Sequence, residues 1–360
     1  LSAAPPAVYR RVTFWLQFDS GFKDTVKGRI QHMNTAEIIE RCRELPGVTV
    51  STRDGYAELM LSNAEGKGRM RFCPVFPGIT LAGISVGAPV WPAPGAESCT
   101  PEAKGPLIIN YCTRGRCELV LNDGRHVFLT AGQISLTERF AQREYVYPGR
   151  VYEGIEIFID PETAESGAEV LMDGFGLDVG ALRGEYCPGG ETFIARLALP
   201  DALTARLSAA IDGADSVARV GMKTGVIELL AMLLYEKPAH TAEPQVFYTK
   251  SQVEIAKQTE RIITSDLAKQ HTVREFAALF SVSESSIRNY FTGVFGQSIS
   301  QYTTRQRMLH AAKLLAETRL SVIKVAGRAG YANQSKFAAA FRREFGCAPL
   351  EYRRKNRLNG

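Results

Sequence analysis

The sequence predicts an α+β multidomain protein, in which a β-rich N-terminal region and a helical segment precede an all-α C-terminal domain. Three observations predict this order. Apolar residues alternate with a period of two between residues 48 and 160, which is typical of strands. They follow a helical period in residues 161–240 and again beyond residue 251. The C-terminal part also contains one pattern written twice. With 360 residues and 45% hydrophobic side chains, the chain can build two or three cores.

The internal repeat lies in the last hundred or so residues. Thr272–Ala277 and Ser321–Ala326 match at an offset of 49 residues. The residues Phe291, Phe295 and Gly296 then recur at an offset of 50, as Phe341, Phe345 and Gly346. A repeat of this length is one supersecondary unit used twice.

Each copy is predicted to form two short helices joined by a tight turn. In the first copy, Thr272 and Glu275 have capping-box spacing, and Ser283 is a natural N-cap for the second helix. In the second copy, Gly330 begins the turn and Asn333 takes the cap position. The inward faces of the two second helices are apolar: Ile287, Phe291, Val294 and Phe295 in one, and Phe337, Phe341 and Phe345 in the other.

The outward faces of these second helices are polar, as expected of helices that read DNA. A helix-turn-helix unit places the outward N-terminal part of its second helix in the major groove, where Arg suits guanine and Asn or Gln suits adenine. Singly, each such residue is more often an ordinary solvated side chain. Their common phase on two matched helices favours base reading by Ser285, Arg288, Asn289, Thr292, Gln334, Ser335 and Lys336.

A helix predicted from about Ser298 to Thr318 separates the two copies. Roughly 20 residues rising about 1.5 Å each span about 30 Å, close to the rise of about 34 Å for one DNA turn. Five arginines nearby are candidates for phosphate contacts: Arg305, Arg342, Arg343, Arg353 and Arg354. From Ser251 onward the chain has 18 Lys and Arg against 8 Asp and Glu, a net +10, whereas the preceding residues have 25 against 30, a net −5. The positive charge therefore belongs to the repeat, as a polyanionic partner requires.

Residues Val253 to Arg354 resemble the DNA-binding domain of AraC/XylS-family transcription regulators. The motifs that carry the resemblance are the unit from Ala277 to Phe295, Arg307-x-x-x-Ala311, Ala326-Gly-x-x-Gly-Tyr331, Ser335-Lys-Phe337, Phe341-Arg-Arg-x-Phe-Gly346 and Pro349-x-x-Tyr-Arg353. The resemblance implies sequence-specific DNA binding, with base contacts at Ser285, Arg288 and Asn289 and at Gln334, Ser335 and Lys336. Ala338 and Ala339 stand where relatives often have longer polar side chains, which reduces the expected base reading by the second helix.

The N-terminal region is predicted to contain many short antiparallel strands, typical of a small sandwich or barrel. Ahead of such a DNA-binding domain, it resembles the cupin-like jelly roll with which many family members sense a small molecule. A turn at Arg114-Gly115 would place Cys112 opposite Cys117 in a hairpin, within disulfide range, although buried reduced cysteines are the commoner case. The expected strands are Val48–Ser51, Tyr56–Ser62, Met70–Phe72, Ile79–Val86, Leu107–Cys112, Cys117–Leu121, His126–Leu129, Ile134–Thr137 and Glu153–Ile159.

Aromatic residues of this region are candidates for an effector pocket, although core packing is the commoner role for any one of them. The chosen candidates are Tyr111, Phe128, Tyr145 and Tyr147, and Trp91, Phe140 and Tyr152 belong to the same group. His126 is the one histidine in the strand region, so the clustered histidines of a cupin metal site are missing and no cofactor is expected. Catalytic groups cannot be assigned from spacing, and we expect a protein that is not an enzyme.

The predicted domain order has five parts. Residues 1–32 are a non-native or disordered extension, residues 33–165 the jelly roll, residues 166–240 a helical segment, residues 241–250 a linker and residues 251–360 the DNA-binding domain. The apolar helix Val220–Tyr235 either forms a homodimer or packs on its own barrel. No stretch of about 18 apolar residues is present, and seven Cys fit a reducing compartment, so we expect a cytoplasmic protein. The resemblance to AraC/XylS regulators implies a bacterial, nucleoid-associated one.

The expected partners are double-stranded DNA, a small-molecule effector, a second copy of the chain and RNA polymerase. Two other hypotheses remain open at this point. The N-terminal region could bind a partner protein and no small molecule, which shallow apolar patches without a closed cavity would favour. It could also be a cupin enzyme tethered to DNA, with His126 as a metal ligand.

Overall fold

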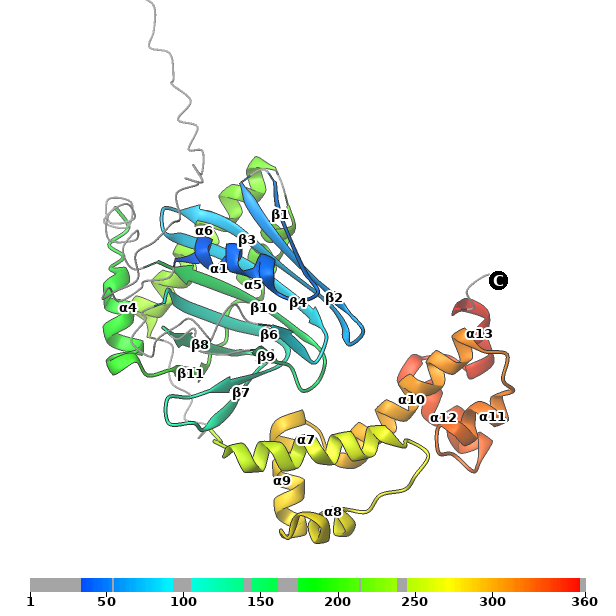
Figure 1. The fold of residues 1–360 in the computed structure, drawn as a ribbon. Coiled ribbons are helices and arrows are strands. Elements are labelled where there is room, and N and C mark those ends of the chain that lie inside the picture. The colour runs from blue at the N-terminus through cyan, green and yellow to red at the C-terminus, as the bar shows by residue number, and fades with distance from the viewer. Residues whose placement is uncertain are drawn as a thin grey trace, which may run out of the picture. The chain divides into compact units, whose positions relative to one another are not determined.

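The computed structural model describes residues 34–53, 55–92, 105–138, 144–160, 174–213, 215–237 and 245–356 (Figure 1). Residues 1–32, residues 241–244 of the predicted linker and Phe140 lie outside this description. An antiparallel sheet domain is followed by an all-helical C-terminal region, as predicted. Whether the sheet domain is a jelly roll stays a prediction. None of the helices in the described ranges has the length and apolar character needed to cross a membrane.

The sheet domain begins with helix α1 (Thr35–Arg41) and a 3₁₀ turn (Cys42–Glu44). Hydrogen-bonded neighbours follow the order β1-β2-β3-β4-β10-β6-β8-β11, while β5 pairs with β9, and β7 and β9 pair with β6. All of these pairs are antiparallel. The strands are β1 (Val48–Arg53), β2 (Tyr56–Asn63), β3 (Gly66–Phe76), β4 (Ile79–Gly87), β5 (Val90–Pro92), β6 (Leu107–Val120), β7 (His126–Thr130), β8 (Gln133–Thr137), β9 (Glu144–Val146), β10 (Tyr152–Ile159) and β11 (Phe193–Arg196).

The predicted hairpin between Cys112 and Cys117 is wrong, because β6 runs without a turn from Leu107 to Val120. Cys112 pairs with Gly154 of β10, whereas Cys117 pairs with Leu129 of β7, so the two thiols are not opposed. The chain passes from one partner strand to the other at Gly115, whose φ of 87° belongs to the left-handed region. A Cβ at this position would collide with the Val151 carbonyl.

Helices cover one face of the sheet. These are α4 (Val179–Tyr186), α5 (Asp201–Asp212) and α6 (Ser216–Ala231), and a π-helical turn (Met232–Glu236) extends α6. Val226, Leu229, Leu230 and Leu233 of the apolar stripe are buried in one core with Leu81, Ile109 and other residues of the sheet. Of the two roles left open for this stripe, the structure shows packing on the chain's own sheet.

The short strand β11 lies in the segment predicted to be helical, and the prediction did not include it. Its four residues, Phe193–Arg196, pair with β8 at the end of the sheet. Such a short strand has no alternation that a sequence pattern can detect, and its hydrogen bonds to a distant strand define it.

The C-terminal region consists of α7 (Lys250–Ser265), α8 (Val273–Phe280), α9 (Glu284–Phe295), α10 (Ile299–Glu317), α11 (Val322–Arg328), α12 (Gln334–Phe345) and α13 (Pro349–Asn356). The predicted caps are confirmed: Thr272 and Glu275 form a capping box, and Ser283 and Asn333 cap α9 and α12. The two copies of the repeat therefore begin their helices with side chains that bind the free N–H groups.

Two separate cores hold the two copies, and α10 contributes to both. Ile299 and Tyr302, from its first turns, pack with Phe291 of α9. Met308 and Leu315, farther along α10, pack in the second core. The two cores are thereby fixed on one rigid element.

We predict that Gly115→Ala lowers the free energy of unfolding by about 3 kcal/mol or more, because the new Cβ meets the Val151 carbonyl and forces the strand to move. Gly124 is the matched control: its φ is 79°, and the space around its missing Cβ is open. Gly124→Ala should cost about 1 kcal/mol from backbone strain alone. Urea denaturation of both variants measures the difference, and equal losses would contradict the proposed passage of β6 between two partner strands.

Candidate functional site

Helix α9 presents the first set of predicted base-reading side chains. Ser285, Arg288, Asn289 and Thr292 are all exposed, while Ile287 and Phe291 between them are buried. The Ser283 Oγ accepts a hydrogen bond from the Ser286 amide, which fixes the N-terminal end of the helix. The geometry therefore leaves a polar outer face at the end that a helix-turn-helix unit inserts into the major groove.

Arg288 forms an ion pair with Glu284 one turn earlier, with Nη2 at 2.9 Å from Oε2. Both side chains are about half exposed, at 57% and 45%. An exposed pair of this spacing contributes only about 0.3–0.5 kcal/mol. Arg288 can therefore exchange its carboxylate for a base edge at little cost.

Helix α12 presents the second set. Gln334, Ser335 and Lys336 are exposed, and Phe337 and Phe341 are buried on the opposite face. The Lys336 amide donates a hydrogen bond of 2.9 Å to Asn333 Oδ1, so the three residues form the first turn of the helix. Ala338 and Ala339 follow directly, and their methyl groups offer no hydrogen bonds to a base.

Helix α10 sets the separation between these two helices. It has 19 residues, begins at the Ser298 cap and ends before Thr318, as predicted. At about 1.5 Å per residue it is roughly 28 Å long. Near its middle, Arg307 is 8% exposed and donates from Nε to the Leu267 carbonyl at 2.7 Å and from Nη2 to the Lys269 carbonyl at 3.0 Å.

The five candidate phosphate-binding arginines differ in their surroundings. Arg342, Arg343 and Arg354 are exposed, and Arg305 is also exposed with its Nε 3.7 Å from Glu344 Oε1. Arg353 is different, because its guanidinium donates to the carbonyls of Leu315 at 3.3 Å and Leu320 at 2.5 Å. These carbonyls lie at and beyond the C-terminal end of α10, where backbone acceptors lack helical partners. Arg353 thus holds α13 to α10, a tertiary role that its position in the sequence did not reveal.

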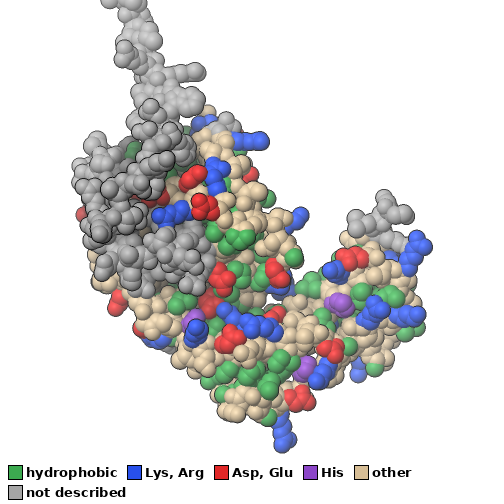
Figure 2. Space-filling model, in the orientation of Figure 1, with side chains coloured by type: hydrophobic (Ala, Val, Ile, Leu, Met, Phe, Trp, Pro, Cys, Tyr) green, Lys and Arg blue, Asp and Glu red, His purple; other side chains and the backbone are tan. Residues whose placement is uncertain are grey.

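Lys and Arg side chains are spread over the C-terminal helices in the view of Figure 2, with apolar and acidic side chains between them. This distribution agrees with the net charge of +10 counted from Ser251 onward. A field of this sign attracts the phosphate backbone without selecting a sequence.

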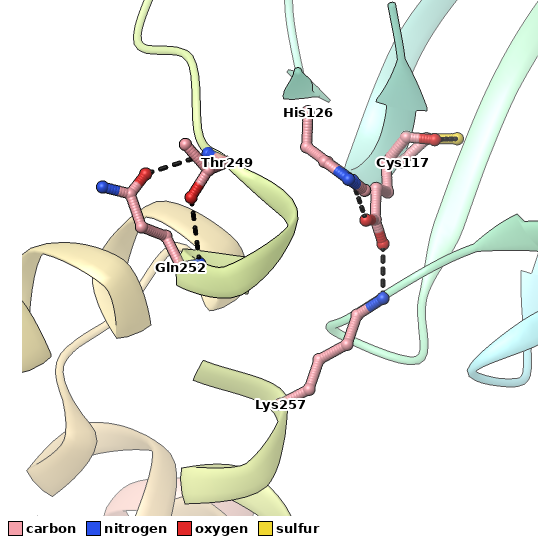
Figure 3. Close-up of polar contacts among 6 residues, drawn as sticks. Cys117, His126, Thr249, Gln252 and Lys257 are labelled. Atoms are coloured by element: carbon pink, nitrogen blue, oxygen red, sulfur yellow. Dashed lines mark hydrogen bonds and ion pairs between the residues drawn. The ribbon is translucent and has the colours of Figure 1, made fainter. Parts of the chain in front are cut away.

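A contact between β6 and helix α7 was not foreseen. Glu118 is 3% exposed, and its carboxylate lies 2.7 Å from His126 Nδ1 and 2.8 Å from Lys257 Nζ (Figure 3). The neighbouring Arg116 donates a hydrogen bond to the Gly293 carbonyl of α9. His126 and Tyr248 also exchange backbone hydrogen bonds of 2.8 Å. No sequence signal could pair residues 139 positions apart in the chain.

The sheet domain contains a cavity of about 140 Å³. Its wall includes Tyr145 and Tyr147 from the predicted effector group, together with Trp91 and Tyr152. The other two candidates lie elsewhere among the described residues. Tyr111 packs in the core between the sheet and helices α5 and α6, and Phe128 packs in the core formed with α7 and α9.

One acidic residue, Glu156, is among the described residues that line this cavity. Burial raises the pKa of its carboxyl from 4.5 to about 8. Asn110 Nδ2 donates a 2.9 Å hydrogen bond to Glu156 Oε1, and Tyr152 donates its hydroxyl to Asn110 Oδ1 at 2.6 Å. No sequence pattern predicted this network, since a single Glu in a strand has no characteristic spacing.

Comparison with known proteins places residues 276–355 in the helix-turn-helix domain family. The RCS-specific HTH-type transcriptional activator RclR of Escherichia coli K12 is 37% identical over 86 residues, which are 24% of this chain and 30% of RclR. The HTH-type transcriptional activator RhaR of Mannheimia succiniciproducens is 31% identical over 91 residues, which are 25% of this chain and 33% of RhaR.

Among solved structures, the DNA-binding domain of the transcriptional factor AdpA in complex with a target DNA is 29% identical. The matched residues are 28% of this chain and 90% of the AdpA domain, and the TM-score is 0.27. The chain spans about a third of the length of the curated relatives named above.

We predict that Arg353→Ala lowers the free energy of unfolding of the C-terminal region by about 2 kcal/mol, because two carbonyls lose a charged donor. Arg354→Ala is the control, since the exposed Arg354 side chain should change stability by less than about 0.5 kcal/mol. Thermal denaturation followed by circular dichroism compares the two. Equal melting temperatures would refute the structural role of Arg353.

The Glu156 carboxyl also predicts a pH dependence of stability. The folded state holds the proton up to about pH 8, whereas the unfolded state releases it near 4.5, so stability falls as pH rises through this window. The loss is at most about 5 kcal/mol. Glu156→Gln removes this loss, so the variant should gain stability relative to the wild type between pH 5 and pH 8. If the urea midpoints of Glu156→Gln and the wild type change with pH in parallel, the predicted pH dependence is wrong.

Proposed function

Because the C-terminal domain of this chain belongs to the AraC/XylS family of helix-turn-helix domains, we propose that the protein is a sequence-specific transcription regulator. Its two recognition helices, α9 and α12, read one DNA site in successive major grooves on the same side of the duplex. RNA polymerase is the partner through which such a regulator acts, in the bacterial cytoplasm and at the nucleoid.

The observation that carries this proposal is the pair of polar helix faces attached to one rigid helix. The exposed residues Arg288 and Asn289 on α9 and Gln334 on α12 have the chemistry that suits guanine and adenine edges. The span of α10, roughly 28 Å, is near the rise of about 34 Å for one DNA turn. RclR and RhaR, both named as transcriptional activators, are similar to this chain over 86 and 91 residues.

We propose further that a small-molecule effector binds in the cavity of the sheet domain, which would then be the jelly-roll sensor of the resemblance. The cavity of about 140 Å³ favours this reading over a partner-protein surface, for which shallow apolar patches would be expected. His126 is held by Glu118, with 2.7 Å between Nδ1 and Oε1, which supports a structural role more than that of a metal ligand. The effector would act by binding one of two arrangements of the domains more tightly.

A homodimer remains part of the proposal, but its interface must differ from the one first considered. The apolar stripe of α6 is occupied by the chain's own sheet. Val217 and Val220, which are 79% and 60% exposed near the start of the same helix, are the apolar side chains still available there.

Arg288→Ala should weaken binding to the preferred site about 10- to 100-fold and relax the choice of one base pair, because a bidentate base contact contributes about 1–3 kcal/mol of discrimination. Arg343→Ala should weaken binding to all sequences alike and reduce the slope of log K against log salt by about 1. Site selection from a random DNA pool, followed by fluorescence anisotropy at several salt concentrations, measures both. If Arg288→Ala keeps the wild-type sequence preference, α9 does not read bases through this side chain.

A further inference from the structure

We propose that the effector is a small organic amine, bound as its ammonium ion by Glu156 between aromatic walls of the cavity. This inference rests on the proposed effector site in the sheet domain and adds the chemical class of the ligand.

Glu156 lies in the middle of β10, paired in register with Ala82 of β4 and Asn110 of β6. Asn110 occupies its Oε1, and Tyr152 fixes the Asn110 amide from the other side. Oε2 accepts no hydrogen bond from any residue that the structure describes. The described lining residues also include no Lys, Arg or His. Glu156 is partly buried at the cavity wall. An ionised carboxylate among such walls without a cation is costly, and an ammonium group would supply both the charge and the missing donors.

The remaining walls suit the organic part of such a ligand. Trp91 is 1% exposed, and Tyr147 and Tyr152 stack with their ring centroids 5.0 Å apart. Aromatic faces attract cations, most strongly where water is excluded. An apolar cavity of about 150 Å³ accommodates benzene, so the 140 Å³ found here fits a ligand with about one ring.

Binding of an ammonium ion requires the ionised form of Glu156, whose pKa burial raises to about 8 in the empty protein. Affinity should therefore rise between pH 6.5 and pH 8, with release of one proton. The other titratable groups around the cavity are Cys42 on α1, Cys117 on β6, Tyr145 on β9, Tyr147 and Tyr152. Burial raises the pKa of each of them, so they stay uncharged in this range.

Isothermal titration calorimetry of the full chain with benzylamine, benzyl alcohol and benzoate tests the inference, because the three probes share one ring and differ in charge. We expect benzylamine to bind at least tenfold more tightly than the other two, and more tightly at pH 8 than at pH 6.5. Glu156→Gln should abolish this preference while the protein still unfolds cooperatively. Glu153→Gln, on the same strand, is the control, since Glu153 pairs with Arg114 at the surface and should leave the preference unchanged.

Equal binding of benzylamine and benzyl alcohol, or a preference that survives in Glu156→Gln, would overturn the amine assignment and leave an effector site of another specificity. Absence of binding by all three probes would overturn it as well. DNA binding measured on the same preparation separates these outcomes from a failure of the proposed regulatory function, which would appear as loss of sequence preference in the anisotropy assay.

Discussion

The rigidity of α10 is the constraint on which the C-terminal region depends. Two small cores, each too limited to define a large surface alone, are built on the same 19-residue helix. Tyr302 closes the first core and Leu315 the second, and Arg307 between them binds the loop after α7. Because a helix has a fixed rise per residue, the distance between the two cores is set by the number of residues between them.

The exposed faces of α9 and α12 can be polar without cost to stability. In each second helix, burial is confined to the face opposite the side chains that are proposed to read bases, so the exposed residues serve no packing function. The Arg288–Glu284 pair illustrates this freedom, because both partners remain half exposed. Under the proposed function, substitutions at these positions would change the preferred DNA sequence while the two cores stay intact.

Local signals in the sequence predicted the helical region well. The caps Thr272, Ser283 and Asn333, and the ends of α10, were found because a cap and its helix are only a few residues apart. The prediction of two strands joined by a turn at Gly115 failed for the opposite reason. Whether a chain turns or continues there depends on β10 and β7, which follow much later in the sequence.

The candidate sites also divide into features that local sequence predicts and features that depend on distant contacts. Exposure of Arg288 and Lys336 follows from helical phase, which a sequence reveals. The engagement of Arg353 with two carbonyls does not, since it depends on how α13 docks against α10. The aromatic group was predicted as a set. Only the fold separates Tyr145 and Tyr147, on the cavity wall, from Tyr111 and Phe128, in other cores.

Strand β6 joins two environments residue by residue. Cys117 and Leu119 line the cavity, while Arg116 and Glu118 between and beside them bind α9 and α7. Neighbouring residues of one strand share peptide planes, so neither set can shift without the other. Energetic effects of substitutions at positions 116–119 will consequently not add independently. A double-mutant cycle between Cys117 and Glu118, whose side chains lie on opposite faces of the strand, measures this coupling energy.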